Sequence, residues 1–352
     1  MQFPMPSDPL AHRLSDPLAL RLSDPLALRL SDPLALAPPV ILAPMAGITD
    51  LPWRRVVAGF GAGLVVSEMV ASEEVMRDHP EMRSRAELGV TESHTAVQLV
   101  GREPYWMAEA ARFVEAQGAR VIDINMGCPT KRVTTGACGS ALLRDLDHAL
   151  RLIEAVVGAV KVPVTLKTRL GWDDASLNAP ELARRAEAAG IKMITIHGRT
   201  RCQLYKGQAN WPAIRAVKQA VRIPVIANGD IVDAATAGQA LTQSGADGVM
   251  IGRGAQGAPW RLAQISHALH GTPAPRVPQG ADLATLVAGH YEAMLAFYGV
   301  DLGARCARKH LGWYLEEAGL SDHRPALLAN DSPAHVLHLI DRIFTQAERR
   351  AA

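Results

Sequence analysis

Between residues 38 and 270 the sequence alternates short apolar runs with segments whose apolar residues recur at helical spacing. Short apolar runs that end at Gly, Pro, Asn or Asp are typical of buried strands, and a helix between two such strands makes them neighbours in a parallel sheet. Eight such runs occur, which is the number that closes a TIM barrel. The sequence therefore predicts an α/β fold, a (β/α)8 TIM barrel, with strands at 40–43, 63–67, 95–100, 121–125, 164–167, 193–196, 224–227 and 248–251, and helices at 51–60, 104–117, 142–160, 180–189, 211–220 and 233–243.

The first 37 residues are predicted to lie outside this fold. From residue 8 to residue 36 they repeat an eight-residue unit, DPLAHRLS and then DPLALRLS. A proline in every unit interrupts a helix, and Ser-Asp before it favours a turn. We interpret residues 1–37 as a disordered extension, with a leucine-bearing interaction arm as the alternative. Removal of residues 1–36 is then expected to leave activity and melting temperature nearly unchanged.

Beyond the barrel the pattern changes to helices alone. Residues 271–280, GTPAPRVPQG, are predicted to be a linker, and residues 281–352 a small helical domain. Within the barrel region, 38–270, the long charged segment 69–93 admits two interpretations, a solvated helix with its connecting loops or a lid over the active site.

The composition bounds the class of protein. The formal net charge is +2, so gross charge neither requires nor excludes a nucleic-acid partner. Four cysteines without a C-x-x-C pair argue against a zinc site and a disulfide scaffold, so we expect no bound metal. No apolar run reaches the ~18 residues of a membrane span, and the N-terminus lacks the order of a signal peptide. We therefore expect a cytoplasmic monomer without membrane contact or an obligate protein partner.

A thiol follows the fourth predicted strand. Gly127 lets the chain turn, Cys128 comes next, and Pro129 stops the strand. In barrels of this kind the catalytic residues lie at the C-terminal ends of the strands. A single cysteine is more often a small buried hydrophobic residue, but the other three lack this position between glycine and proline. Cys128 is therefore the candidate catalytic residue, beside a basic loop that contains glycine.

The other strand ends carry residues that suit a phosphate and a ring. The seventh and eighth strands end in NGD and GRG, where backbone N–H groups and a helix start often bind phosphate. Lys167 inside a barrel is unfavourable unless it faces an electron-rich group. Flavin mononucleotide (FMN) would supply both a phosphate and a polarisable ring, and ordinary polar strand ends are the alternative. The strand-end residues are Pro44, Met45, Ala46, Gln98, Asn125, Lys167, Arg169, His197, Arg199, Asn228, Gly229, Asp230, Gly252 and Arg253.

Several motifs occur in order along the barrel region, namely APMAGITD (43–50), INMGCP (124–129), LKTRLGW (166–172), TIHGRTR (195–201), IANGDI (226–231) and MIGRGAQGAPW (250–260). Together they resemble the bacterial tRNA-dihydrouridine synthases. The resemblance is to the B-type subgroup and covers about residues 38–352, including ARKHLGWYL (307–315) in the helical tail. It implies an oxidoreductase, a flavoprotein with FMN in a TIM barrel that takes hydride from NADPH and reduces a uridine of the tRNA D-loop to dihydrouridine.

The same resemblance implies a role for each matching residue. Hydride would reach C6 of the uracil while Cys128 protonates C5, with Asn125, Arg169 and Arg199 at the substrate. The chain departs from the family at the repeat and at Cys138, where we expect a small residue such as alanine. FMN would be lined by Pro44, Met45 and Ala46, contacted at its ring by Gln98, Lys167 and His197, and held at its ribityl and phosphate end by Asn228, Gly229, Asp230, Gly252 and Arg253.

The helical tail is not basic, because residues 281–352 contain seven Lys and Arg against nine Asp and Glu. Arg305, Arg308 and Lys309 nevertheless recur at helical spacing near Trp313, which makes them candidate tRNA contacts. A solvated helix face with Trp313 in the core is the alternative. Two other functions stay open: an FMN-dependent barrel oxidoreductase of a small pyrimidine, like dihydroorotate or dihydropyrimidine dehydrogenase, or a non-enzymatic RNA-binding protein on a barrel scaffold.

Overall fold

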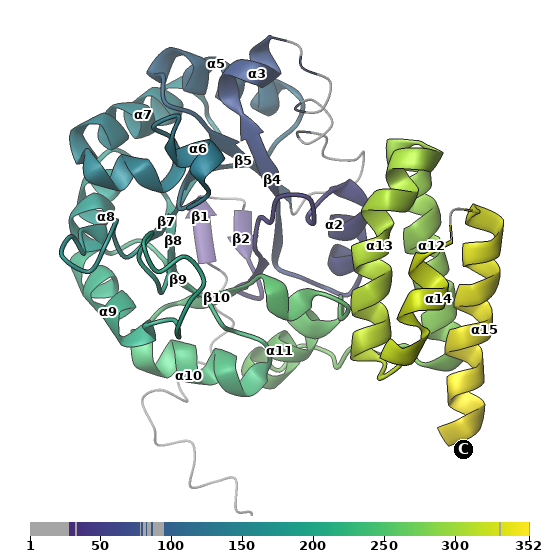
Figure 1. Cartoon of the computed structure of the whole chain (residues 1–352). Coiled ribbons are helices and arrows are strands. Elements are labelled where there is room, and N and C mark those ends of the chain that lie inside the picture. The colour runs from purple at the N-terminus through teal and green to yellow at the C-terminus, as the bar shows by residue number, and fades with distance from the viewer. Residues whose placement is uncertain are drawn as a thin grey trace, which may run out of the picture.

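A computed structural model of the chain describes residues 28–31, 34–77, 79, 82, 86, 95–330 and 332–351. Parallel strands close into a barrel in the order β10-β3-β4-β5-β6-β7-β8-β9, which confirms the predicted (β/α)8 fold (Figure 1). The second strand extends beyond its predicted end, because Met69, Val70 and Ala71 pair with Gln98–Val100 after a register shift. The strands are β3 (Val40–Leu42), β4 (Leu64–Ala71), β5 (Thr95–Val100), β6 (Val121–Met126), β7 (Val164–Arg169), β8 (Met193–His197), β9 (Val225–Asn228) and β10 (Gly248–Ile251).

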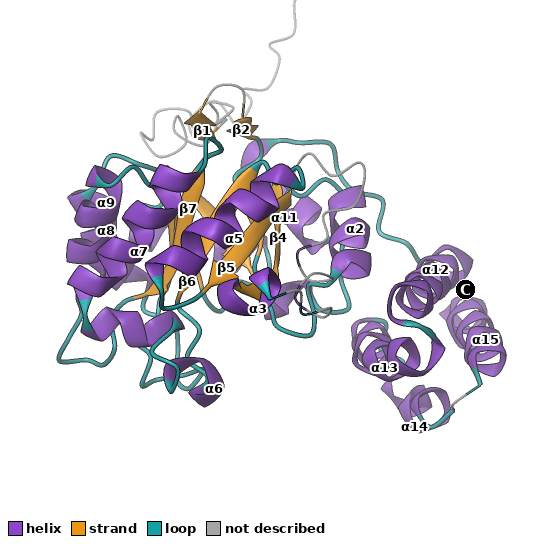
Figure 2. Ribbon diagram, turned by 90° about the horizontal axis from the view of Figure 1, so that it is seen from above, coloured by secondary structure: helices purple, strands orange, loops and turns teal. Residues whose placement is uncertain are grey.

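Helices cover the outside of the barrel, and their apolar faces form the main core with outward-facing strand residues (Figure 2). The helix expected at 142–160 is divided. Residues Gly139–Arg144 form a 3₁₀ turn, and α7 begins after Asp145, whose carboxylate accepts the His148 N–H at 2.9 Å. The helices of the barrel are α2 (Leu51–Gly59), α3 (Ser72–Met76), α5 (Pro104–Ala116), α6 (Lys131–Thr134), α7 (Leu146–Ala159), α8 (Ala179–Ala188), α9 (Trp211–Ala220), α10 (Ala234–Ser244) and α11 (Arg261–His270).

Of the charged segment 69–93, the first residues complete β4 and α3 follows. Most of the remainder lies outside the described residues, so the choice between a helix and a lid stays a prediction there.

A second apolar cluster fills the inside of the barrel. Alternate strand residues such as Ile41, Val66 and Met250 point inward and pack together. Leu36 belongs to this cluster and is only 1% exposed, although it lies in the predicted extension.

Residues Leu28–Ser31 (β1) and Leu34–Leu36 (β2) pair as an antiparallel hairpin at the end of the barrel opposite α6 (Figure 2). The end of the predicted extension is therefore part of the fold, because Leu36 fills the barrel floor. Residues 1–27 lie outside the described part of the chain.

Helices alone follow Gly280, and they pack beside α2 (Figure 1). At this junction the ring of Trp53 lies 5.4 Å from that of His290 and 5.2 Å from that of His310, measured between centroids. Burial lowers the pKa of His290 to about 3 and also lowers that of His310, so both pack as neutral rings. Within the described ranges, no helix is long and apolar enough to span a bilayer. These helices are α12 (Gly280–Tyr298), α13 (Val300–Glu317), α14 (Arg324–Leu328) and α15 (Pro333–Ala351).

We expect Leu36→Ala to lower the free energy of unfolding by about 2–4 kcal/mol, because it leaves a cavity in the barrel floor. Removal of residues 1–36 should lower the melting temperature for the same reason. Removal of residues 1–27, which spares both strands of the hairpin, should have a smaller effect. Thermal unfolding of the three proteins beside the full chain measures this, and an unchanged melting temperature for Leu36→Ala would show that the floor does not depend on it.

Candidate active site

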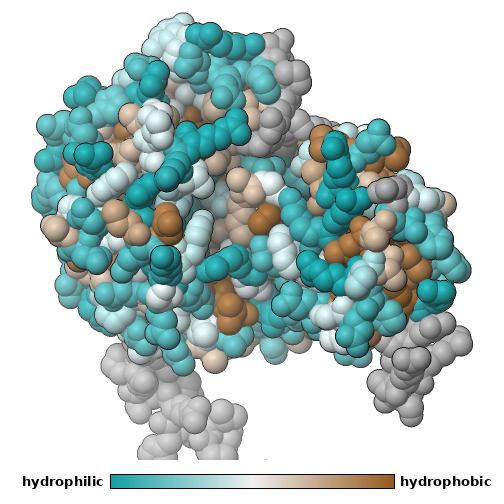
Figure 3. Space-filling model, in the orientation of Figure 1, coloured by the Kyte–Doolittle hydropathy of each residue, from teal (hydrophilic) through white to brown (hydrophobic). Residues whose placement is uncertain are grey.

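The C-terminal ends of the strands surround a cavity of about 750 Å³, a usual size for a small-ligand or cofactor site. Figure 3 shows that the mouth of the barrel is hollowed and rimmed largely by hydrophilic residues. The cavity lies where a TIM barrel carries its active site. It brings together nearly all the strand-end residues singled out in the sequence, namely Pro44, Met45, Ala46, Gln98, Asn125, Cys128, Lys167, Arg169, His197, Asn228, Gly229, Asp230, Gly252 and Arg253.

A chain of buried hydrogen bonds runs up one wall to the thiol. The carboxylate of Asp123 accepts Nε2 of Gln98 at 2.7 Å and Oγ1 of Thr165 at 2.6 Å. Nδ2 of Asn125 donates to Oε1 of Gln98 at 2.7 Å. Oδ1 of Asn125 then accepts the backbone N–H of Gly127 at 3.1 Å and of Cys128 at 2.9 Å. Asn125 therefore positions the thiol loop. It also lines the cavity, and its predicted contact with substrate stays a prediction.

The loop after Cys128 folds back on the same residue. The Cys128 carbonyl accepts the N–H of Ser140 at 3.1 Å and its hydroxyl at 2.9 Å. Gly139 has φ +59°, and a Cβ there would lie 2.9 Å from this carbonyl, so the close approach requires glycine. The Cys128 Sγ lies 3.4 Å from Oγ1 of Thr130. Cys138 is on the same loop but lines a neighbouring cavity, where burial raises its pKa.

Lys167 lies on β7 and His197 on β8, the two strands that follow β6. Nζ of Lys167 donates to Oδ1 of Asn228 at 3.1 Å. Burial and the neighbouring Arg169 lower the pKa of Lys167 to about 8. Burial and the charges of Arg169 and Lys167 lower the pKa of His197, so its ring is neutral at pH 7. Nδ1 of His197 is buried and has no hydrogen-bond partner among the described residues, which makes it available to a bound group.

The arginine of β7 lines the cavity but is bound to the protein. Arg169 donates to the carbonyls of Gly127 at 2.8 Å, Thr200 at 3.0 Å and Leu204 at 2.9 Å. It therefore ties the Cys128 loop to the loop after β8. Its predicted contact with substrate stays a prediction, limited to the part of the side chain that faces the cavity.

Arg199 does not line the cavity, contrary to its predicted contact with substrate. It is 1% exposed and donates to both carboxylate oxygens of Asp230, at 3.0 and 2.5 Å. Burial alone would raise the pKa of Asp230, but hydrogen bonds from Arg199 and the Ala209 N–H outweigh it and lower the pKa. The guanidinium of Arg253 lies 3.5 Å from the same carboxylate. Asp230 therefore binds both Arg199 and Arg253, and its side chain lines the cavity, as that of Arg253 does.

Tyr205 is a cavity residue that the sequence analysis missed. Its side chain is 54% exposed at the mouth, and the guanidinium groups of Arg169 and Arg253 lie 5.5 and 5.2 Å from its ring centroid. These distances suit cation–π contact. The sequence feature that could have identified Tyr205 is that an aromatic residue follows the HGRTR motif in the same loop.

Gly47, the residue after the Pro44–Ala46 turn, is held by two hydrogen bonds. The Gly47 N–H donates to the carboxylate of Glu68 on β4. The Gly47 carbonyl accepts Nζ of Lys309 from α13. Lys309 thus joins the helical domain to the wall of the cavity, and its predicted contact with tRNA stays a prediction. The sequence could not reveal this, because the partner is a backbone carbonyl far away in the chain.

The other two predicted contacts of the tail lie on the same helix. Arg305 is exposed, and Arg308 is partly buried. Trp313 is also partly buried, with its ring 5.2 Å from that of His310. Lys309 is also partly buried, so Arg305 is the most exposed of the three.

The fold and cavity define a TIM-barrel protein with a thiol, a lysine and a neutral histidine around one ligand-sized space. The family model for dihydrouridine synthase (Dus) matches residues 41–348. A probable tRNA-dihydrouridine synthase of Rhodobacter capsulatus is 62% identical over 314 residues, which cover 89% of this chain and 97% of that protein. The tRNA-dihydrouridine synthase B of Vibrio vulnificus is 47% identical over 311 residues, 87% of this chain and 95% of that protein. The chain belongs to the dihydrouridine synthase family.

Solved structures share the fold. Histamine dehydrogenase from Rhizobium sp. 4-9 aligns with a TM-score of 0.53 at 13% identity, covering 77% of this chain and 51% of that one. An amine oxidase from Pseudomonas geniculata N1 aligns with a TM-score of 0.55 at 14% identity, covering 78% and 53%. The match spans about half the length of these two proteins, and the likeness concerns the fold alone.

Asn125→Ala should release the thiol loop, because two backbone N–H groups lose their acceptor. We expect a loss of about 1–3 kcal/mol in the free energy of unfolding and faster alkylation of Cys128 by iodoacetamide, followed by mass spectrometry of its peptide. Asn210→Ala is the matched control, since it removes the cap that accepts Ala213 N–H at 3.0 Å and lies on another loop. This control should lower stability without changing the alkylation rate of Cys128. A wild-type alkylation rate in Asn125→Ala would contradict the positioning role of Asn125.

Proposed function

We propose that this protein is an FMN-dependent tRNA-dihydrouridine synthase, with NADPH as electron donor and a D-loop uridine of tRNA as substrate. The observation that carries the proposal is the Cys128 thiol, fixed by Asn125, on the wall of the same cavity as Lys167 and His197. Membership of the dihydrouridine synthase family and the names of its relatives support the choice of substrate.

The cavity residues fit FMN. Lys167 is a cation beside the cavity, and His197 Nδ1 is a buried nitrogen that a ring atom can pair with. At the other end, Gly252 lines the cavity without a side chain. Arg253, with a side chain 58% exposed, supplies a charge for a phosphate. We assign Pro44, Met45 and Ala46 to the flavin, Gln98, Lys167 and His197 to its ring, and Asn228, Gly229, Asp230, Gly252 and Arg253 to the ribityl and phosphate end.

When bound, reduced FMN supplies a hydride to C6 of the uracil. Cys128 gives its proton to C5, so the C5–C6 double bond becomes single and the thiolate regains a proton from water. A thiol is a suitable general acid near neutral pH. Lys167 stabilises negative charge at the ring it faces. Asn125 and Arg169 hold the Cys128 loop in place through the backbone of Gly127 and Cys128.

The tRNA is proposed to dock across the rim of the barrel and the helical domain. Arg305 and Arg308 of α13 reach solvent, and Lys131 and Arg132 of α6 are exposed beside the Cys128 loop. The target base must leave its stack to enter the cavity, and a single-stranded loop makes that least costly. We further propose a cytoplasmic monomer without an obligate protein partner.

The test uses purified protein, NADPH and tRNA that lacks dihydrouridine. We expect the protein to carry non-covalent FMN, and Arg253→Ala to lower its occupancy. Under anaerobic conditions tRNA should reoxidise the reduced flavin and acquire dihydrouridine in its D-loop. A colourless, folded protein that ignores added FMN would defeat the proposal. Reoxidation by uracil or another small pyrimidine, and not by tRNA, would favour the small-molecule alternative.

FMN binding should weaken above about pH 8. The pKa of Lys167 is about 8, and a hydrogen bond from its ammonium group to an oxygen of the bound ring would raise that pKa, so the protonated lysine binds FMN better. Affinity should therefore fall by up to about tenfold per pH unit above this value. Fluorescence titration of the FMN-free protein measures it. Lys167→Arg should keep tight binding to higher pH and Lys167→Met should show a flat profile, whereas identical profiles for wild type and Lys167→Met would exclude the linkage.

Cys128→Ala should separate the two half-reactions. It should bind FMN and accept electrons from NADPH normally, because the thiol takes no part in that step. Reoxidation by tRNA should slow by about two to four orders of magnitude, the usual contribution of a positioned acid. Cys138→Ala and the exposed control Cys202→Ala should do far less. The measurement is single-turnover reoxidation; a wild-type rate for Cys128→Ala would make the thiol structural, and failed reduction by NADPH would assign it to the cofactor site.

A further inference from the structure

A second cavity, of about 570 Å³, opens beside the first and has no role in the function proposed above. The two cavities share Ala46, Met69 and Thr130 in their walls. Oγ1 of Thr130 lies 3.4 Å from the Cys128 sulfur. A group in the second cavity would therefore be a direct neighbour of the group that reacts at Cys128.

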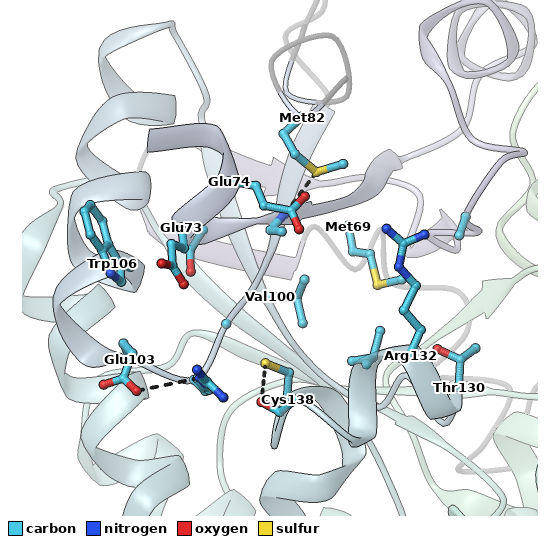
Figure 4. A pocket seen from close by; sticks show the side chains of 17 residues that line it. Met69, Glu73, Glu74, Met82, Val100, Glu103, Trp106, Thr130, Arg132 and Cys138 are labelled. Carbon is cyan, nitrogen blue, oxygen red and sulfur yellow. Dashed lines mark hydrogen bonds and ion pairs between the residues drawn. The ribbon is translucent and has the colours of Figure 1, made fainter. Parts of the chain in front are cut away.

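The second cavity has walls that suit a flat ring. Met69, Val100 and Val133 provide apolar surface, and Trp106, in the first turn of α5, stands on one side (Figure 4). Apolar and aromatic side chains of this kind are what unstacked nucleobases stack on in proteins that bind single-stranded RNA. The volume is also within the range of pockets that hold ligands the size of a nucleoside.

Carboxylates line the same side as the tryptophan. Figure 4 shows Glu73 and Glu103 beside Trp106, with Glu74 between them and the opposite wall. Glu73 pairs with Arg77 at 2.7 Å, and Glu103 with Arg102 at 3.7 Å. Among the described residues, Glu74 has no ion-pair partner. Carboxylates accept N–H donors and repel phosphates, so this side suits the amino-bearing edge of a base.

Arg102, which pairs with Glu103, also lines the cavity, and a second arginine lies on the opposite side. Arg132 lies beside Met69 and Thr130, at the border with the first cavity (Figure 4). Arginine is the residue best suited to bind a phosphate. If two neighbouring bases of an RNA strand occupied the two cavities, the phosphate between them would lie at this border. Each base would then contact one cavity, and the phosphate would contact Arg132.

We propose that the second cavity binds the base of a nucleotide adjacent to the reacting uridine in RNA, and prefers a base with an exocyclic amino group. The inference rests on the proposed function, because it takes the RNA with its target uridine at Cys128. The adenine of NADPH has similar chemistry, and the experiment distinguishes the two sources.

The probe is an RNA hairpin that carries the target uridine, in which either neighbouring nucleotide is made abasic in turn. With wild-type protein, one abasic position should slow single-turnover reoxidation of the flavin by roughly 10- to 100-fold, the usual effect of losing one stacked base. Trp106→Ala should slow the intact hairpin by a similar factor and the abasic hairpin no further. Trp106→Phe should restore most of the rate. Leu177→Ala, at a 52% exposed apolar residue that lines neither cavity, is the control and should leave the rate unchanged.

The preference for one base over another is measured by varying the base next to the target uridine. Glu74→Gln should reduce the preference for an amino-bearing base over uracil, while Glu154→Gln, an exposed carboxylate on α7, should not change it. Binding supplies a readout that needs no turnover. The fluorescence of a hairpin with 2-aminopurine at the coupled position should be quenched by wild-type protein and much less by Trp106→Ala.

Three results would overturn the proposal. The effects of the abasic site and of Trp106→Ala could multiply, which would mean that they act at separate places. Trp106→Ala could slow reduction by NADPH and leave reoxidation by RNA intact, which would assign the cavity to the dinucleotide. The 2-aminopurine signal could be the same in both proteins. If wild-type protein reduces no uridine at all, the proposed function fails, and the binding measurement still decides whether the cavity takes a base.

Discussion

The active site depends on one buried carboxyl group, that of Asp123 inside the barrel. Burial raises its pKa, and the hydrogen bonds from Gln98 and Thr165 oppose that shift by favouring the charged form. Through Gln98 and Asn125 the same carboxyl group determines the position of the Cys128 backbone. A buried polar group that loses its partner destabilises the fold by about 1–3 kcal/mol, so the members of this chain fix one another. The thiol loop is therefore oriented from the barrel interior rather than by contacts at the surface.

The helical domain supports the same site from outside. Lys309 bonds the Gly47 carbonyl, and Tyr298 donates to Asp50 at 3.0 Å. Burial raises the pKa of Asp50 to about 6, while the Trp53 N–H and Tyr298 lower it, so the carboxylate is charged at neutral pH and accepts both bonds. The domain that exposes Arg305 to solvent is thus also part of the framework of the cofactor-sized cavity.

Sequence could predict where polar side chains converge, because the C-terminal ends of parallel strands meet at one face of a barrel whatever the loops do. It could not predict how those side chains pair. Asn125 and Arg199 were placed at the substrate. The structure shows that Asn125 bonds Gln98 on the neighbouring strand and the Cys128 backbone just after its own strand, and that Arg199 bonds Asp230 beyond the end of β9. Asp123 was not identified as a site residue, because the sequence alone does not show which side chains pair with a polar residue inside an apolar run. Leu36 was assigned to a disordered repeat, since its proline context is local and the barrel floor that it fills is not.

The two adjacent cavities differ in charge, and this difference bears on the kind of substrate. Lys167, Arg169 and Arg253 make the first positive, since Arg199 offsets Asp230. In the second, Arg77 and Arg102 offset Glu73 and Glu103, so Glu74 leaves that wall with an excess of negative charge, and Arg132 lies near the border. Water and salt screen charges over about 8 Å, so each cavity selects mainly by its own residues. A free pyrimidine would use only the first cavity. A strand of nucleotides, which alternates bases with phosphates, presents groups for both, and its phosphates also suit the exposed Arg305 of the helical domain.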